Sequence, residues 1–178
     1  IIGVNALGVY DRSYQIMRYP VLLTTGAFNS AIQPALTGRK DDLSYISSHH
    51  NKLSERLLCL AIPLSIYIFT NAKEITFFLM GSQWNLVIPL VEIFSISLPV
   101  QILISTSGGF FQAINKPKLL FKAGVIGSIL FVTSISFSMV FEDIYLVGWA
   151  VSVSFFLNSI SIYFILFKYG FEIDVSPF

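Results

Sequence analysis

Six polar side chains share one face of the first predicted helix, at about residues 14–37 and the residues just before it. At 100° of rotation per residue they fall within an arc of about 100°, and they are Asp11, Tyr14, Arg18, Thr25, Asn29 and Gln33. If this helix crosses a membrane, lipid cannot satisfy such a face, which should then contact other helices or water. The pattern therefore predicts a polar binding surface.

Arg18 is the strongest single candidate on this face. It lies seven residues after Asp11, which places it about 10 Å further along the helix axis. A membrane arginine is costly unless it is paired or solvated, so it is a functional candidate by default. Its planar guanidinium suits phosphate in a two-pronged geometry that lysine cannot copy. The alternatives are that Arg18 reaches the outer membrane interface or pairs with Asp11 or Glu92.

A second polar group lies in the predicted apolar segment 86–112. Glu92 is its single acidic residue, and it could pair with Arg12 or Arg18, carry a coupling proton or sodium ion, or lie near the outer interface. Gln101 lies on a roughly opposite face, so this segment is polar on two sides, as expected inside a bundle.

Motifs for catalysis and metal binding are weak. His49 and His50 are adjacent and point in different directions on a helix, so one metal ion cannot easily take both. The patterns G-x-S-x-G, H-E-x-x-H and G-x-x-x-x-G-K-[ST] do not occur. The single cysteine, Cys59, excludes an internal disulfide and a cysteine-based zinc site. We therefore expect no catalytic residue, no metal and no cofactor.

The composition indicates a membrane protein. Apolar residues make up 54% of the 178 residues and charged residues 12%, about half of the roughly 25% in a soluble domain. A helical crossing needs about 20 mostly apolar residues. We predict an all-α integral membrane fold with five crossings at about 14–37, 55–72, 86–112, 119–141 and 144–167, and an interfacial turn at Ile75–Met80. A soluble helical core is disfavoured, because the last two apolar stretches are separated only by Glu142 and Asp143.

Basic residues orient the predicted crossings. Those on one face are Arg39, Lys40, Lys52 and Arg56 in a predicted loop 38–56, Lys116, Lys118 and Lys122 in a loop 115–122, and Lys168. This face should be cytoplasmic, because cytoplasmic loops carry an excess of lysine and arginine. The opposite face has Lys73 and, near the first crossing, Arg12. The net charge of +1 gives no reason to expect a nucleic-acid partner.

Several residues are expected to bend or join these helices. Prolines fall in or near the first three crossings, at Pro20, Pro34, Pro63, Pro89 and Pro99, and Gly108-Gly109 is expected to break the third. Bent helices around a cavity suit a transporter, although proline is also commoner in membrane helices. Ser154, Asn158 and Ser161 follow i, i+4, i+7 on the last crossing, which predicts helix packing rather than substrate binding.

Four short motifs resemble segments of bacterial polysaccharide exporters, in the same order. Gly8–Tyr14 with Met17 and Pro20 is similar to L-G-x-Y-x-[RA]-[AS]-Y…P, Pro34–Leu36 with Asp41-Asp42 to P-A-L-S…D-D, Pro63 with Gly81–Trp84 to P…F-G-x-Q-W, and Gln112–Pro117 to A-x-G-[KR]-[PT]. Order and spacing agree over about residues 1–125. Thr37 stands where the family usually has serine, and Asn115 where it usually has glycine.

The motifs resemble those of Wzx-like flippases of O-antigen, capsule and exopolysaccharide synthesis, in the multidrug/oligosaccharidyl-lipid/polysaccharide (MOP) exporter superfamily. The resemblance implies a transporter of roughly 12–14 helices in two halves around a cavity. Such proteins move undecaprenyl-pyrophosphate-linked oligosaccharide from the inner to the outer leaflet of the bacterial cytoplasmic membrane. Residues 1–178 would form a single transmembrane domain, the second half of such an exporter.

The resemblance also implies roles and partners. Tyr14, Asn29 and Gln33 would bind sugar hydroxyls and Arg12 or Arg18 phosphate, while Thr25 and Gln101 are further cavity candidates and Glu92 could couple an ion. The expected partners are the lipid-linked oligosaccharide, membrane lipids, the N-terminal half of the same protein, and a polysaccharide polymerase with its chain-length machinery.

Three alternatives stay open. A membrane-embedded polysaccharide polymerase or acyltransferase would need a large outer loop or an intramembrane His/Asp/Arg set. A cation-coupled drug antiporter of the same superfamily would favour acidic residues over arginine in its cavity. The chain could also be a non-functional gene fragment, since half a cavity cannot transport unless two such chains assemble.

Overall fold

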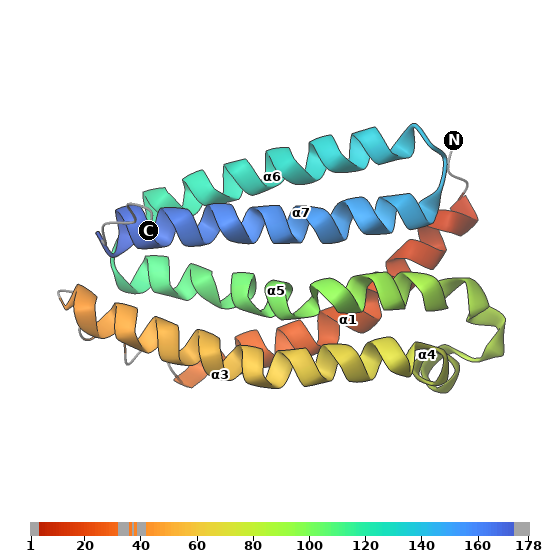
Figure 1. Ribbon diagram of the computed structural model, residues 1–178, viewed down its shortest axis with the longest axis horizontal. Helices are drawn as coiled ribbons and strands as arrows, with labels where there is room; N and C mark the ends of the chain where they lie inside the picture. Colours follow the sequence, from red (N-terminus) through yellow and green to blue (C-terminus); the bar gives the residue numbers. More distant parts are fainter. Residues whose placement is uncertain (1–3, 32–35, 37, 39–41, 173–178) are drawn as a thin grey trace.

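The structure, a computed structural model, describes residues 4–31, 36, 38 and 42–172 (Figure 1). All elements in these ranges are helices: α1 (Val4–Ala31), α3 (Leu43–Thr70), α4 (Ala72–Met80), the 3-10 helix η1 (Ser82–Val87), α5 (Ile88–Ala113), α6 (Pro117–Met139), α7 (Ile144–Ile165) and the π-helix η2 (Leu166–Gly170). Among the described residues, four helical segments are long and apolar enough to cross a membrane: α3, η1 with α5, α6, and α7 with η2. The predicted all-α membrane fold is confirmed.

The first predicted crossing coincides in part with α1. The helix has 28 residues and begins at Val4 rather than near residue 14, while residues 32–35 and 37 lie outside the described ranges. It is not among the four apolar segments, and it carries Asp11, Arg12 and Arg18. Figure 1 shows it running obliquely across the bundle in the same direction as α5. Its crossing of the membrane therefore stays a prediction.

Helix α3 begins at Leu43 rather than near residue 55, so the predicted loop 38–56 is wrong from this point onward. Asp42 caps the helix, because its carboxylate accepts a hydrogen bond of 2.9 Å from the Tyr45 backbone N–H. Lys52 and Arg56 therefore lie on a helix. Hydropathy identifies only the apolar part of a helix, which can lie in lipid. A helix with a capped N-terminus can begin well before that apolar part.

Helix α5 is the centre of the bundle. It packs against α1 and α3 on one side and against α7 and α6 on the other (Figure 1). Buried residues make up 56% of the apolar window of η1 and α5, against 11% for α6, which lies at the outside against α7. One hydrophobic cluster joins α1, α3 and α5 around Phe94, and a second lies near the other end of the bundle around Phe110.

The residues that were expected to interrupt helices lie inside them. Pro20, Pro63 and Pro99 are internal to α1, α3 and α5, and α5 continues through Gly108-Gly109 to Ala113. The predicted break at this pair is wrong. A Cβ at Gly108 would lie 3.9 Å from the Leu120 Cδ1 atom of α6, so the glycine pair lies where two helices approach.

The turn between α5 and α6 explains one departure from the exporter motif. Asn115 has φ of 55°, in the left-handed region, and the Lys116 N–H donates to the Phe111 carbonyl at 3.0 Å to close the helix end. Glycine adopts this conformation without strain, and asparagine is among the few other residues that do so routinely. Asn115 therefore preserves the turn.

The predicted interfacial turn at Ile75–Met80 is a short helix, α4. Figure 1 shows α4 nearly end-on, whereas the long helices run across the picture. Ala72 and Thr76 face the protein, and Phe78 and Leu79 are exposed. Gly81, with φ of 90°, turns the chain into η1.

Candidate functional site

Helix α1 packs on α5 with one face and leaves only part of the predicted polar face open, because Tyr14 packs against Phe94 of α5. Ser13, Ile16 and Met17 are buried, and the Ser13 hydroxyl donates to the Val9 carbonyl at 2.7 Å. Asp11 and Arg18, in contrast, are exposed. In the described part of the chain, no ion pair joins Arg18 to Asp11 or Glu92. The structure therefore does not support the alternative in which one of these carboxylates pairs with Arg18.

Arg18 lies beside the first half of α5. The Tyr14 ring meets the Phe94 ring edge-on, with 5.7 Å between centroids, and α1 and α5 run in the same direction. The Ser13 hydroxyl, in turn, lies 3.4 Å from the Val87 carbonyl, just before α5 begins. Arg18 follows Ser13 by five residues and Tyr14 by four, so these two contacts place it about 7–15 Å beyond the start of α5.

The other predicted residues of α1 have local partners. The Arg12 guanidinium lies 5.8 Å from the Trp84 ring centroid, a cation–π contact with η1, and donates to the Gln15 side-chain carbonyl at 3.3 Å. The Thr25 hydroxyl donates to the Val21 carbonyl at 2.8 Å. The side chain of Asn29 and the whole of Gln33 lie outside the described part of the structure.

Glu92 and Gln101 lie at different depths in α5. Glu92 is half-buried in the second turn of the helix, at the end where α4 and η1 lie. Gln101 is 5% exposed, and its amide donates to the Ser97 hydroxyl at 2.9 Å, which in turn lies 3.4 Å from the Ser152 hydroxyl of α7. Gln101 thus belongs to a polar chain between α5 and α7, and its binding role stays a prediction.

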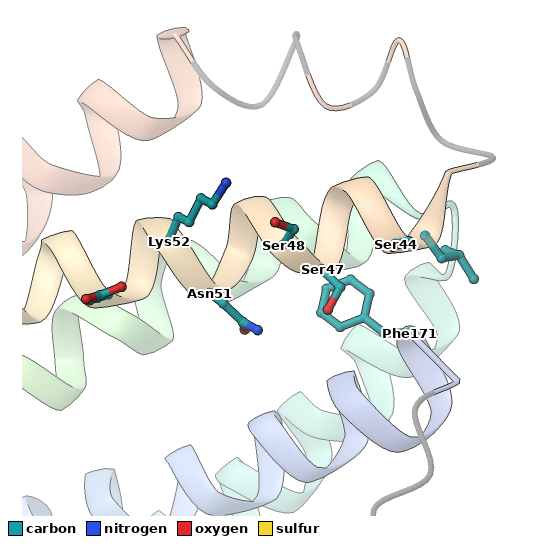
Figure 2. A pocket seen from close by; sticks show the side chains of 8 residues that line it. Ser44, Ser47, Ser48, Asn51, Lys52 and Phe171 are labelled. Carbon is teal, nitrogen blue, oxygen red and sulfur yellow. The ribbon is translucent and has the colours of Figure 1, made fainter.

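A hollow of about 530 Å³ lies along the first four turns of α3. We call it the α3 hollow, and its lining is Leu43, Ser44, Ser47, Ser48, Asn51, Lys52, Glu55 and Phe171. Figure 2 shows Lys52 and Asn51 extending from opposite sides of the helix, with Phe171 near Ser47. Phe171 comes from the far end of the chain and is buried, so it forms an apolar wall.

Helical periodicity produces this lining. Ser44, Ser48, Asn51 and Glu55 are spaced i, i+4, i+7, i+11, which places them on one face of a helix. The sequence prediction missed them because it treated residues 38–56 as a loop. The Asp42 cap followed by this spacing was the signal that could have identified them.

The α3 hollow combines hydroxyls, an amide, an ammonium and a carboxylate. Hydroxyl and amide groups can exchange hydrogen bonds with sugar hydroxyls. The Lys52 ammonium is a point charge that suits phosphate. The hollow therefore offers groups that could bind a sugar-phosphate head group, next to the apolar side chains of Leu43 and Phe171.

His50 lies beneath this surface and has a packing role. It is 2% exposed, with its ring 4.7 Å from the Phe110 ring and 5.7 Å from the Phe171 ring. Its Nδ1 atom lies 3.3 Å from the Asn51 Oδ1 atom. Within the described ranges, no three His, Cys, Asp or Glu side chains gather to hold a metal ion.

Comparison with known proteins decides the family. A family model described as "Polysaccharide biosynthesis protein" matches residues 1–89, half of the chain. The chain belongs to this family. The matched part holds α1, α3, α4 and η1, and it includes three of the four exporter motifs. The family match thus agrees with the resemblance to polysaccharide exporters.

One relative of this chain is the teichuronic acid biosynthesis protein TuaB of Bacillus subtilis (strain 168). The two are 24% identical over 120 residues, which are 67% of this chain and 25% of TuaB. The chain therefore matches only a quarter of its relative's length. No solved structure matches it.

One lysine, Lys116, joins the start of α6 to the C-terminal end of η2. The Lys116 ammonium, before α6, donates to the carbonyls of Tyr169 and Gly170 at 2.9 and 3.0 Å. It also contacts the Glu172 carboxylate at 2.7 Å. A cation is favourable at these carbonyls, because the C-terminal end of a helix carries partial negative charge. Lys116 therefore holds the end of α7 and η2 against the turn that begins α6.

This contact gives a prediction for pH. The hydrogen bond and charge of Lys116 lower the pKa of Glu172 below its ordinary value of 4.5. The ion pair therefore stabilises the folded end above pH 4.5, and this contribution is lost as the pH falls through the lowered pKa. In Lys116→Met we expect the titration midpoint of Glu172, measured by NMR with labelled glutamate, to rise toward 4.5. Lys118→Met is the control, and equal Glu172 midpoints in Lys116→Met and the intact protein would contradict the assignment.

Proposed function

We propose that this protein moves lipid-linked oligosaccharide across the bacterial cytoplasmic membrane for polysaccharide synthesis, without making or breaking bonds. The cargo would be the undecaprenyl-pyrophosphate-linked repeat unit, carried from the inner to the outer leaflet. The observation that carries the proposal is an exposed arginine, Arg18, beside the first half of α5 in a bundle of apolar helices.

A charge at this depth needs a polar neighbour. An arginine at the centre of a bilayer costs about 2.5–3.5 kcal/mol on insertion scales, so such residues face a bundle interior or a water-filled cavity. Asp11 is exposed on the same face of α1. This face is suited to line a wet path, and a planar guanidinium in that path is suited to hold a pyrophosphate.

The α3 hollow is a suitable place for the head group of the cargo to bind at the start of this path. It lies at the end of the bundle that carries Lys116 and Lys168, and the distribution of basic residues predicts that this end is cytoplasmic. Its hydroxyls, the Asn51 amide and the Lys52 ammonium would receive the sugar and phosphate, while the lipid tail stays in the bilayer. The remaining part of an exporter cavity would come from the N-terminal half of the protein.

The experiment uses a strain in which the gene for this protein is deleted. We would measure which leaflet holds the undecaprenyl-linked repeat unit, and then restore the intact gene, Lys52→Ala or Lys118→Ala. We expect completed units to be trapped on the inner leaflet and released by the intact gene. Lys52→Ala should export about three- to tenfold more slowly, since an exposed charge-assisted contact contributes about 1 kcal/mol, and Lys118→Ala should match the intact protein.

Two outcomes would contradict this proposal. Repeat units that reach the outer leaflet of the deletion strain but stay unpolymerised would overturn transport and favour a membrane-embedded polymerase. Equal export by Lys52→Ala and Lys118→Ala would show that the α3 hollow does not bind the cargo. The role of Arg18 is tested by its own substitution.

A further inference from the structure

Two lysine side chains from different helices meet at one aromatic ring at the basic end of the bundle. The Lys122 ammonium of α6 and the Lys168 ammonium of η2 each lie 5.7 Å from the Tyr169 ring centroid. The two ammonium groups are therefore no further apart than twice this distance. Figure 1 shows that α6 begins at the same end of the bundle at which α7 and η2 finish. We call these three residues the Tyr169 cluster.

The positive charge of the Tyr169 cluster is not compensated within the described part of the chain. No carboxylate of the described residues forms an ion pair with Lys122 or Lys168, and both lysines and Tyr169 are exposed. A ring contact occupies one side of an ammonium group and leaves other N–H donors free. Because two like charges repel, an anion that contacts both lysines would stabilise the cluster.

The Tyr169 cluster lies at the ends of two apolar helices. Lys122 is in the second turn of α6, and Lys168 is in η2, which ends the last apolar segment. Both lysines are thus close to the level at which the helices leave the lipid. Tyrosine is enriched at this level because its ring is apolar and its hydroxyl is polar. The anions that surround a membrane protein at this depth are lipid head groups.

On the side toward the bilayer centre, the same two helix faces are apolar. Val125 follows Lys122 by three residues on α6, Phe164 precedes Lys168 by four residues on α7, and both are exposed. These spacings place each apolar side chain on the same face as its lysine. The Phe164 ring meets the Tyr169 ring edge-on, with 6.3 Å between centroids. A molecule with an anionic head and an apolar tail fits this order of groups better than a free anion does.

We propose that the Tyr169 cluster, with Val125 and Phe164, binds an anionic phospholipid of the surrounding membrane. The head-group phosphate accepts hydrogen bonds from the two ammonium groups, and an acyl chain lies along the two apolar side chains. Basic sites between transmembrane helices on the cytoplasmic side suit such head groups, and the distribution of basic residues predicts that this end is cytoplasmic. This site does not depend on the proposed transport function, because it concerns a lipid of the membrane itself.

Native mass spectrometry of the whole protein in detergent, titrated with phosphatidylglycerol, measures the affinity for the lipid. We expect Lys122→Met and Lys168→Met each to weaken binding about three- to tenfold, as for the loss of one lysine beside an anionic lipid. Lys168→Arg should bind like the intact protein, because it keeps the charge. Lys118→Met is the matched control, since Lys118 is exposed one turn before Lys122 on α6 but is not one of the lysines at the Tyr169 ring.

Two further ligands identify the occupant. At constant ionic strength, phosphatidylcholine with the same acyl chains should bind more weakly than phosphatidylglycerol, because its head group has no net charge. Inorganic phosphate should not displace phosphatidylglycerol, because it has no acyl chain. The proposal is overturned if Lys122→Met and Lys168→Met bind phosphatidylglycerol as tightly as Lys118→Met does, if the two lipids bind equally, or if inorganic phosphate displaces the lipid.

Discussion

Replacing Arg18 with alanine is expected to slow oligosaccharide export about ten- to hundredfold. A hydrogen bond to a charged group contributes about 1.5–3 kcal/mol, and each 1.4 kcal/mol is a factor of ten in rate. Arg18→Lys should restore part of this loss, because it keeps the charge but not the planar guanidinium. The readout is the rate at which repeat units reach the outer leaflet of the complemented deletion strain.

The matched control removes a cation elsewhere. Lys73 lies on α4 with its ammonium 5.8 Å from the Phe77 ring centroid, so Lys73→Ala changes the charge without touching the α1 face. Membrane levels of all variants would be compared to separate export from folding. Export by Arg18→Ala at the intact rate would show that Arg18 does not contact the cargo.

Of the substitutions proposed for this protein, Gly148→Leu is expected to lower the free energy of unfolding most. Gly148 lies where α7 crosses α5, and a Cβ there would meet the Leu90 Cδ2 atom at 2.6 Å and the Ile93 Cγ2 atom at 3.6 Å. Leu90 is fully buried, so it has no space to move. Overpacking of this kind costs about 1–3 kcal/mol or more, and it would separate α7 from the central helix.

Thermal unfolding in detergent measures this effect. Gly8→Leu is the control, because a Cβ added at Gly8 meets no atom within 4 Å and leucine favours a helix over glycine. We expect the midpoint of Gly148→Leu to fall and that of Gly8→Leu to stay equal or rise. Equal midpoints for the two variants would show that α5 and α7 leave room for a side chain at position 148.

The apolar stretches of the sequence were sufficient to predict the membrane helices but not their ends. Four predicted crossings coincide with apolar helical segments, because about 20 apolar residues have few other stable arrangements. The start of α3 was missed because lysine and arginine were read as loop residues, although Asp42 gave a capping signal. A helix can keep its hydrogen bonds after it leaves the lipid.

The candidate site was predicted where it depends on one helix and missed where it depends on two. The exposed face with Asp11 and Arg18 follows from helical periodicity alone. The depth of Arg18 required the contact between Tyr14 and Phe94, which are 80 residues apart. The wall that Phe171 gives to the α3 hollow likewise joins two ends of the chain, and no local pattern carries such information.

The central position of α5 constrains how the proposed transporter can change shape. Because α1, α3, α6 and α7 all pack on this one helix, any rotation of one side relative to the other would pull α5 away from tightly packed partners such as Gly148. We expect the five long helices to move as a single rigid body during transport. If the protein transports by alternating access, as proposed, the pivot would lie at the exposed part of α1, between this body and whatever contacts Arg18.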